Sequence, residues 1–500
     1  MAEPLKTGAD LGPYLPSDPQ QQLVLITFLT VVCVLFGRYL ANTVGNGQAP
    51  PVFEGLPFIG GLLKFTRDKP MKLMQDGYTK LGEAFTVPVA NKRITFLIGP
   101  DVAPHFFKAT DEEMSQTEVY SFNVPTFGPG VVYDVDLKVR TEQFRWFTEA
   151  LKKERLKMYV PQFVMEAEQY FANWGDEGVV DFKEEFSNLI TKTAARTLLG
   201  REVREQCLEE VTDLLHDLDE GMLPVSVMFP YLPIPAHFRR DKARQRLREI
   251  FGRIIRARRA SGHREEDCLQ QFIDARYQRV NGGRESSEEE ITGLLIAVLF
   301  AGQHTSSITT SWTGLRMVAD KGNSYAKAKE EQRQVMSKHG QDLDMDILGS
   351  MEVLHRNITE ALRLNPPLVL LLRYAKQPFT VTTSTGKQYV VPKGDVVAAS
   401  PNFAHLLPQV FSEPNRYDPD RFLPPREEDK VKPFSFIGFG GGRHGCMGSN
   451  FAYLQIKTIW SVLLRNFDFE LLDPVPEPDY NSMVIGPKKC RVKYVRKKLA

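Results

Sequence analysis

The sequence has few cysteines, and none of them forms a Cys-x-x-Cys pair. The 500 residues contain only Cys33, Cys207, Cys268, Cys446 and Cys490. An odd number of scattered cysteines argues against a disulfide framework and against a structural zinc site. We therefore expect a chain of a reducing compartment in which one cysteine has a special role.

An excess of charge of either sign is also missing. Lys and Arg number 63 and Asp and Glu 62, which gives a formal net charge of +1. This balance argues against nucleic-acid binding through a basic surface. Hydrophobic residues make up 42% of the chain, so a substantial core can form.

No period of 20–50 residues repeats, which excludes solenoids and propellers. Strands and helices do not alternate regularly either, so a doubly wound sheet is not supported. Helical patterns dominate from about residue 140 to 370, and strand-like runs appear at Ala84–Leu97, Phe379–Val391 and Arg491–Val495. We predict a mainly α fold with small peripheral β-sheets.

One uncharged apolar run stands near the N-terminus, at Leu23–Phe36. As a helix it would span roughly 21 Å, short of a hydrocarbon layer of about 30 Å, so whether it fully crosses a bilayer stays open. A cleaved signal peptide is the alternative, but a basic region before the run and a small-residue cleavage site after it are missing. We predict a short segment (1–21), a membrane anchor helix (22–41), a Gly/Pro-rich hinge (42–60) and a cytosolic catalytic domain (61–500).

The densest signal is the glycine-rich run Pro433–Gly448, which a helical pattern from about Asn450 to Leu464 follows. It places Cys446 at the mouth of a helix, where backbone N–H groups and the helix dipole favour a thiolate. Glycines let such a loop lie flat against a macrocycle, and His444 can reach a propionate. The pattern favours a thiolate that binds haem iron.

Two other interpretations of this loop remain. Residues 440–445 also satisfy the dinucleotide pattern G-x-G-x-x-G, but only some fifty residues follow, too few for the rest of a parallel nucleotide-binding sheet. The loop can also be purely structural, with a buried cysteine.

A long helix is predicted upstream, with capping boxes at Ser286 or Ser287 and apolar spacing from Ile291 to Met317. It contains the string Ala-Gly-Gln-His-Thr-Ser at residues 301–306. A glycine and hydroxyls inside a helix weaken the backbone ladder and admit water, as oxygen activation with proton delivery requires. The alternative is an ordinary set of polar residues on a helix face.

The spacing Glu360-x-x-Arg363 places opposite charges on one helix face, where a solvated surface pair is the usual outcome. Farther on, Phe439-x-x-Gly442-x-His444-x-Cys446-x-Gly448 resembles the haem-binding signature of the cytochromes P-450. Pro419-Asp420-Arg421-Phe422 is similar to the family's second arginine motif. The resemblance implies haem b with Cys446 as the axial iron ligand and Phe439 and Gly440 beside the cofactor. It also implies a structural lock of Glu360, Arg363 and Arg421.

Two stretches resemble the sterol 14α-demethylases within that family: residues 301–306 and the run Tyr120–Asp134. By this resemblance the haem propionates would bind Tyr120, Tyr133, Arg373 and His444, whereas Arg145 receives no such role. The family's helix histidine often pairs with an acid, so Asp219, His304 and Thr305 are expected to deliver protons. The resemblance places these residues along the sterol: Phe122, Phe127, Val131, Val132, Ala301, Leu368 and Met483.

The resemblance implies three oxidations of a 14α-methyl group, each using one O2 and two electrons, with release of formate and a Δ14 sterol as product. A phenylalanine at position 122 is similar to what plant-type enzymes carry there, and these act on C4-monomethyl sterols such as obtusifoliol. Lanosterol or 24-methylene-dihydrolanosterol is the alternative substrate. Electrons would come from NADPH through a separate membrane-bound reductase. We expect a monomer anchored in the endoplasmic reticulum membrane, and no nucleic-acid partner. A haem-thiolate isomerase that needs no reductase is the competing enzyme class.

Overall fold

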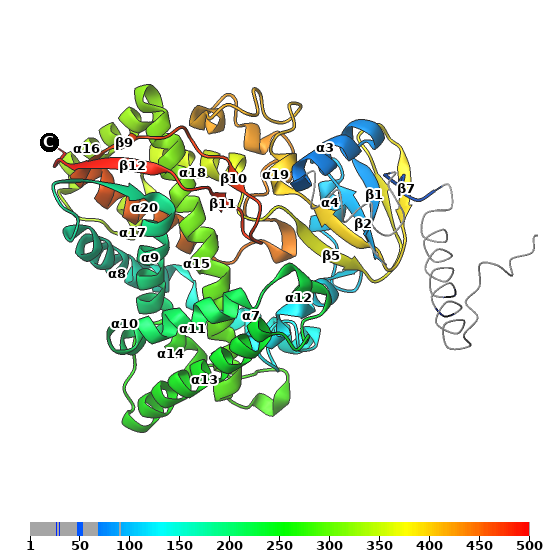
Figure 1. The fold of residues 1–500 in the computed structure, drawn as a ribbon, viewed down its shortest axis with the longest axis horizontal. Coiled ribbons are helices and arrows are strands. Elements are labelled where there is room, and N and C mark those ends of the chain that lie inside the picture. Colours follow the sequence, from blue (N-terminus) through cyan, green and yellow to red (C-terminus); the bar gives the residue numbers. More distant parts are fainter. Residues whose placement is uncertain (1–26, 28–29, 31–47, 54–68, 90–91, 500) are drawn as a thin grey trace, which may run out of the picture.

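Helices form most of the chain, and small sheets lie at its edges (Figure 1). This computed structural model describes residues 27, 30, 48–53, 69–89 and 92–499. The predicted segment 1–21 lies outside the described residues. So do the anchor 22–41, apart from residues 27 and 30, and the hinge 42–60, apart from residues 48–53. The mainly α fold with peripheral sheets is confirmed.

A 32-residue helix, α15 (Glu288–Ala319), crosses the middle of the molecule (Figure 1). The Ser287 hydroxyl accepts the Glu290 N–H at 3.1 Å, and the Glu290 carboxylate accepts the Ser287 N–H at 2.8 Å. This is the predicted capping box at Ser287. The Ser286 hydroxyl instead donates to the Phe272 carbonyl. Although α15 is long and apolar enough to cross a membrane, its most apolar window is 61% buried inside the protein, as in a core helix.

Other helices surround α15 and bury its faces. Those in contact with it are α6 (Val124–Phe127), α9 (Phe182–Ala194), α13 (Pro235–Ser261), α14 (Cys268–Ile273), α18 (Glu352–Leu364) and α20 (Ser449–Asn466). The remaining helices are α3 (Lys69–Leu81), α4 (Ala103–Phe107), α5 (Thr117–Tyr120), α7 (Leu137–Ala150), α8 (Lys153–Ala172), α10 (Arg201–Gln206), α11 (Leu208–Glu220), α12 (Pro224–Met228), α16 (Ala326–His339), α17 (Met345–Gly349) and α19 (Pro401–Ala404). Most of the apolar core lies among these helices.

In the part of the chain that the structure describes, the strands form one larger sheet and three small ones. The larger sheet has the order β1 (Ala84–Val89), β2 (Lys92–Leu97), β8 (Val396–Ala399), β5 (Leu371–Ala375), β3 (Met114–Ser115), with only β2 and β8 parallel. The others are β4 (Glu177–Asp181), β12 (Arg491–Arg496) and β9 (Phe467–Leu471); β6 (Phe379–Thr382) and β7 (Gln388–Val391); and β10 (Pro478–Asp479) and β11 (Gly486–Pro487). All three predicted strand regions therefore contain strands.

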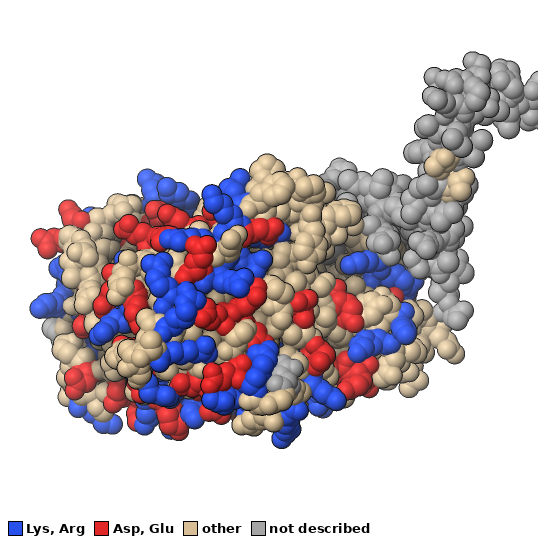
Figure 2. Space-filling view, turned by 90° about the horizontal axis from the view of Figure 1, so that it is seen from below, with Lys and Arg blue, Asp and Glu red and all other residues tan. Residues whose placement is uncertain are grey.

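Charged side chains of both signs are interspersed over the face seen in Figure 2. That face carries no broad field of one sign, in keeping with the net charge of +1.

Candidate functional site

The glycine-rich loop before α20 turns back on itself in front of the helix. The Cys446 N–H donates to the Phe439 carbonyl at 2.9 Å, and the Gly445 N–H donates to the Gly442 carbonyl at 3.2 Å. These two bonds close a short hairpin-like loop that ends at the cysteine. The following helix begins at Ser449, one residue from the predicted start.

Two glycines of this loop are required by its shape. Gly440 and Gly442 have φ values of 69° and 62°, in the region that side chains rarely adopt. A Cβ on Gly442 would also overlap the carbonyl oxygen of Phe107, which shows how closely the loop approaches the end of α4. The loop is thus held against the β-rich part of the molecule.

Cys446 is an exposed residue. The surrounding protein atoms nevertheless raise the pKa of its thiol, and the Gly448 N–H lowers it by less. The prediction that the helix end depresses this pKa was therefore wrong for the protein without a bound metal, because desolvation outweighs one N–H group. Binding to an iron ion would deprotonate the thiol outright.

The dinucleotide interpretation of residues 440–445 fails on the fold. The segment before these glycines is irregular, and the strand after α20 is β9, which pairs antiparallel with β12. A dinucleotide loop needs a parallel strand on either side of its helix.

A cluster of buried cationic and phenolic groups lies near this loop. Arg373 is 3% exposed, and its Nε and Nη1 atoms have no hydrogen-bond partner. Burial lowers the pKa of its guanidinium to about 10. The Tyr120 and Tyr133 rings stack at 5.5 Å, and the Tyr120 hydroxyl accepts the Leu372 N–H at 3.1 Å, next to Arg373.

His444 completes this cluster. Its Nε2 atom lies 3.2 Å from an Asp111 carboxylate oxygen. Burial and the Arg373 cation lower the pKa of the imidazole. Unpartnered buried donors are rare in proteins, and in this cluster they belong to Arg373, one of the residues expected to bind carboxylate groups of the haem. The donor set therefore fits that cofactor.

Sequence reasoning missed the counter-ion of this cluster. Asp111 is buried and binds Arg140 Nη2 at 3.2 Å, while Arg443 Nη1 lies 3.7 Å from its other oxygen. Arg140 also donates to the Thr117 hydroxyl. One carboxylate thus holds cationic side chains from α7 and from the glycine loop, and no motif in the sequence marks it.

The middle of α15 carries the predicted polar string. The Thr305 hydroxyl donates to the Ala301 carbonyl at 2.7 Å. There it competes with the backbone N–H that binds the same carbonyl in the helix. His304 Nε2 lies 3.5 Å from an Asp219 oxygen at the end of α11. The structure thus brings together His304 and Asp219, which are 85 positions apart in the sequence.

The roof loop, residues 121–134, is held in a strained shape. Val132 has φ 51°, an unusual value for a β-branched residue. Its N–H donates at 3.0 Å to the side chain of the buried Gln143, whose amide also binds the Gly130 carbonyl and the Tyr277 hydroxyl. Backbone strain of this kind concentrates at functional sites and needs such support. Gln143 is a second residue that sequence reasoning missed.

The expected sterol-lining residues come from four segments that touch one another. Phe127 of the roof loop packs on Phe300 of α15 at 6.1 Å. The Tyr120 hydroxyl binds β5, the strand that follows Leu368, to the start of the roof loop. The Ile485 N–H donates to the Pro367 carbonyl, which binds the β10–β11 hairpin that carries Met483 to the segment before Leu368. Leu368 and Met483 are 41% and 45% exposed, and Ala301 is exposed in the middle of a core helix. Phe122, Val131 and Val132 are buried.

Arg145, which received no propionate role, pairs with Glu142 at 2.8 Å and donates to the Arg276 carbonyl.

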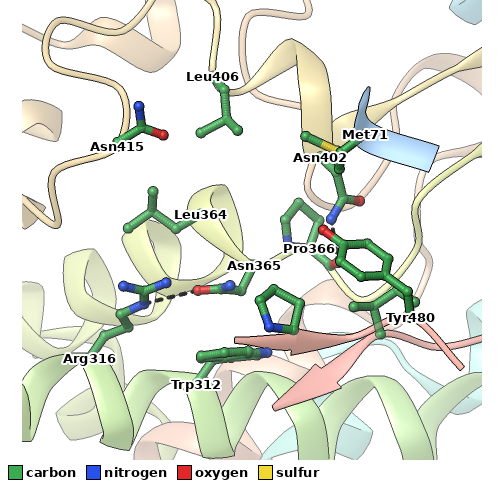
Figure 3. A pocket seen from close by; sticks show the side chains of 12 residues that line it. Met71, Trp312, Arg316, Leu364, Asn365, Pro366, Asn402, Leu406, Asn415 and Tyr480 are labelled. Atoms are coloured by element: carbon green, nitrogen blue, oxygen red, sulfur yellow. Dashed lines mark hydrogen bonds between the residues drawn. The ribbon is translucent and has the colours of Figure 1, made fainter. Parts of the chain in front are cut away.

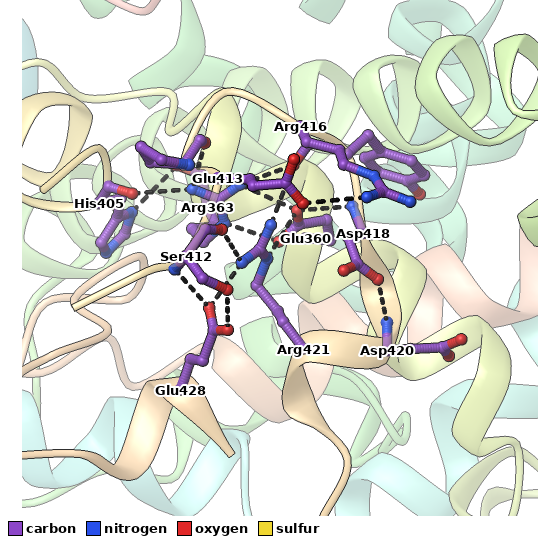
Figure 4. Close-up of polar contacts among 12 residues, drawn as sticks. Glu360, Arg363, His405, Ser412, Glu413, Arg416, Asp418, Asp420, Arg421 and Glu428 are labelled. Carbon is purple, nitrogen blue, oxygen red and sulfur yellow. Dashed lines mark hydrogen bonds and ion pairs between the residues drawn. The ribbon is translucent and has the colours of Figure 1, made fainter. Parts of the chain in front are cut away.

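Behind the loop lies a fully buried ionic lock, made of Glu360, Arg363 and Arg421 (Figure 4). The Glu360 oxygens accept two bonds from Arg363, at 2.7 and 2.9 Å, and one from Arg421 Nε at 3.1 Å. All three side chains are 0% exposed. The predicted triad forms, and the alternative of a solvated surface pair is excluded.

Two further residues belong to this lock. Arg421 also binds Glu428 at 2.6 Å. His405 accepts the Ile437 N–H on Nε2, at 2.8 Å, so its Nδ1 carries the proton and donates to the Arg363 carbonyl. Because Ile437 belongs to the glycine-rich run, His405 connects the lock directly to the loop that carries Cys446.

The comparisons with known proteins agree with this geometry. Residues 50–494 match the family model described as "Cytochrome P450". The chain is 57% identical over 97% of its length to 99% of the sorghum (Sorghum bicolor) "Obtusifoliol 14-alpha demethylase", and 36% identical over 95% of its length to 94% of the mouse (Mus musculus) "Lanosterol 14-alpha demethylase". The solved structure "Retinoic acid bound cyanobacterial CYP120A1" is 23% identical, with a TM-score of 0.77 over 91% of this chain and all of that one; at this identity the match concerns the fold alone.

Proposed function

The chain belongs to the cytochrome P450 family and, within it, to the sterol 14α-demethylases, and from this premise we propose that it removes the 14α-methyl group of a C4-methylated sterol, with obtusifoliol preferred. Three successive oxidations turn the methyl group into an alcohol, then an aldehyde, then formate, and leave a Δ14 double bond. The higher identity to the sorghum obtusifoliol enzyme than to the mouse lanosterol enzyme supports the preferred substrate.

One observation carries the assignment: the thiol of the exposed residue Cys446 stands at the end of a glycine loop, and the neighbouring buried Arg373 has two donors without a protein partner. When bound through Cys446, haem supplies the activation of O2. Arg373 and His444, with the Tyr120 and Tyr133 hydroxyls, would hold its two propionates. Phe439 and Gly440 would lie along the ring.

The proton path uses the residues of α15. We assign Thr305 to hold a proton at its hydroxyl beside the weakened helix turn, and His304 to pass protons in from Asp219. The 3.5 Å separation of the last two is long for a hydrogen bond and allows the pair to open. Both side chains are partly exposed, so solvent can reach the pair.

Phe122 is assigned to substrate choice. Its ring is buried and packs beside Tyr120 at a centroid distance of 6.5 Å. A planar ring removes the space that a second C4 methyl group would fill. Discrimination of one methyl group is worth about 1–3 kcal/mol, a preference and not an exclusion.

We propose that electrons come from NADPH through a separate reductase, and that the protein is a monomer anchored to the endoplasmic reticulum by residues 22–41, followed by a hinge (42–60) and the catalytic domain (61–500). An exposed apolar patch supports contact of that domain with a membrane. Its members lie in and beside α12: Leu223, Val225, Val227, Met228, Phe229, Tyr231, Leu232 and Phe238.

The function is tested by turnover of obtusifoliol and of lanosterol by the full-length protein with reductase and NADPH. We expect 14-desmethyl product and formate from obtusifoliol, with a kcat/KM about tenfold or more above that for lanosterol. Phe122→Leu should narrow this ratio, whereas Phe127→Leu, which alters another roof-loop ring, should not. Equal ratios in wild type and Phe122→Leu would remove the role of Phe122. Product formation without NADPH would indicate the isomerase class instead.

The proton path has its own test. His304→Ala and Asp219→Ala should each lower kcat at least tenfold and leave the sterol-induced spectral titration nearly unchanged. His216→Ala is the matched control, because His216 lies on α11 too but faces Glu220. An equal loss of sterol affinity in the two variants would refute the assignment.

A further inference from the structure

A cavity of about 180 Å³ lies between α15 and the β10–β11 hairpin, and none of its lining residues belongs to the glycine loop (Figure 3). Its walls come from the C-terminal half of α15, the end of α18, α19 and the β10–β11 hairpin. It exceeds an engineered apolar cavity of about 150 Å³ that admits benzene. A molecule of that size therefore fits.

One cationic side chain reaches into this cavity from α15. Arg316 donates from Nε to the Asn365 side-chain oxygen at 3.1 Å, and its guanidinium lies 5.4 Å from the centre of the Trp312 ring (Figure 3). Among the described residues it has this amide partner but no carboxylate in ion-pair contact. Burial lowers the pKa of Arg316, and the nearby Tyr417 and Glu360 offset that effect only in part.

Two fully or nearly fully buried side chains in the same wall also carry unpartnered polar atoms. Trp312 is 0% exposed and its Nε1 has no acceptor; Asn402 is 7% exposed and its Oδ1 has no donor. Such groups call for an explanation by an unseen partner. The rest of the wall is apolar, with Leu364, Leu406 and Ile485 among its members.

We propose that this cavity binds a small organic carboxylate, with its anionic head on Arg316 and its carbon part against the apolar wall. A planar guanidinium matches a carboxylate in two parallel hydrogen bonds. A single cation matches a single negative charge, which disfavours phosphate or sulfate. The absence of acidic side chains among the lining residues removes repulsion of an anion.

Two residues of the cavity wall are close in sequence to expected sterol-lining residues. Pro366 lines the cavity two positions before Leu368, and Ile485 lines it two positions after Met483. Two sources of carboxylate are therefore relevant: formate, released by the enzyme's own reaction, and an organic acid from outside. The formate source rests on the proposed function; binding of a carboxylate as such does not.

The experiment measures thermal unfolding of the haem-loaded, full-length protein in formate or benzoate, at constant ionic strength maintained with chloride. We expect both anions to raise Tm with a saturable dependence, and Arg316→Met to weaken their apparent affinities at least tenfold. Arg333→Met, on the exposed side of α16, should behave as wild type. Leu406→Phe keeps Arg316 and fills the apolar end, so it should abolish benzoate binding and spare formate.

Three results would overturn the proposal. One is an equal Tm increase with chloride alone, and another is undiminished binding in Arg316→Met. The third is binding that tracks a change in the haem spectrum and survives in Arg316→Met, because the anion would then sit at the iron. If Arg316→Met does not fold, Leu406→Phe tests the proposal, and undiminished benzoate binding in that variant would overturn it. No sterol or reductase enters this titration, so its failure leaves the proposed function intact, and failed sterol turnover leaves the carboxylate site intact.

Discussion

Three buried arginines near the glycine loop show two different designs. Arg363 and Arg421 are 0% exposed, and each of their nitrogens donates to a carboxylate or a backbone carbonyl. Arg373 is 3% exposed, but its Nε and Nη1 have no partner. The complete hydrogen bonds of Arg363 and Arg421 hold the fold together, whereas the open donors of Arg373 are available to a ligand. The predictions below test this difference.

The largest effect is expected at the thiol. Cys446→Ala should abolish the thiolate signature in the reduced carbon-monoxide difference spectrum completely, because no other described cysteine lies in the glycine loop. The apoprotein should unfold at an unchanged denaturant midpoint. Cys207→Ala is the control, and persistence of the signature in Cys446→Ala would disprove the ligand assignment.

The next largest effect is expected at the ionic lock of Glu360, Arg363 and Arg421. Glu360→Ala leaves Arg363 and Arg421 without their shared carboxylate and should lower the free energy of unfolding by about 3–5 kcal/mol. Guanidinium unfolding of the purified protein measures this loss. Glu413→Ala removes an exposed ion pair with Arg416 in the same region and should have no measurable effect. Similar losses in the two variants would mean that burial is not the deciding factor.

Arg373→Met should separate haem binding from folding. The rate of haem transfer to an excess of a haem-scavenging apoprotein should rise about 10- to 100-fold, since a desolvated cation facing the propionates is worth one to two powers of ten. The apoprotein should unfold at the wild-type midpoint or above it, because an uncompensated buried charge is removed. Arg443→Met, which alters an exposed neighbour, is the control. A destabilised apoprotein would place Arg373 with the structural arginines.

The smallest effect concerns pH. Burial, with a smaller contribution from the Arg363 cation, lowers the pKa of His405 to about 3, against about 6.5 in an unfolded chain. The unfolded state therefore takes up the proton first as pH falls, and stability is lost below about pH 6.5 and down to the folded pKa. Between pH 7 and pH 5 this group accounts for about 2 kcal/mol.

His405→Gln should reduce the change in the free energy of unfolding between pH 7 and pH 5 by that amount. The comparison uses this change for each protein, so that any loss of stability at pH 7 caused by the substitution itself cancels. His216→Gln, exposed on α11, serves as control. An identical pH dependence in wild type and His405→Gln would contradict the lowered pKa, because this imidazole would then take up its proton over the same pH range in the native and unfolded states.

Much of the fold and the site followed from local sequence signals. The capping box at Ser287 and the apolar spacing indicated α15. The glycines before Cys446 indicated a loop whose backbone closely approaches another segment of the chain. The spacing of Glu360 and Arg363 marked a shared helix face. Such signals are short-ranged, so one sequence suffices to find them.

Tertiary structure decided the rest, because it depends on which distant segments meet. The burial of Glu360 turned an ordinary surface-type pair into a lock, and added Glu428 and His405 to it. Desolvation reversed the expected direction of the pKa of the Cys446 thiol. Asp111 and Gln143 have partners far along the chain, His444 and Tyr277 among them, so nothing local marks them. The sequence by itself determined which chemistry is present, since that depends on residue type and spacing; burial and the pairing of remote side chains determined which of these groups are satisfied and which stay open to a ligand.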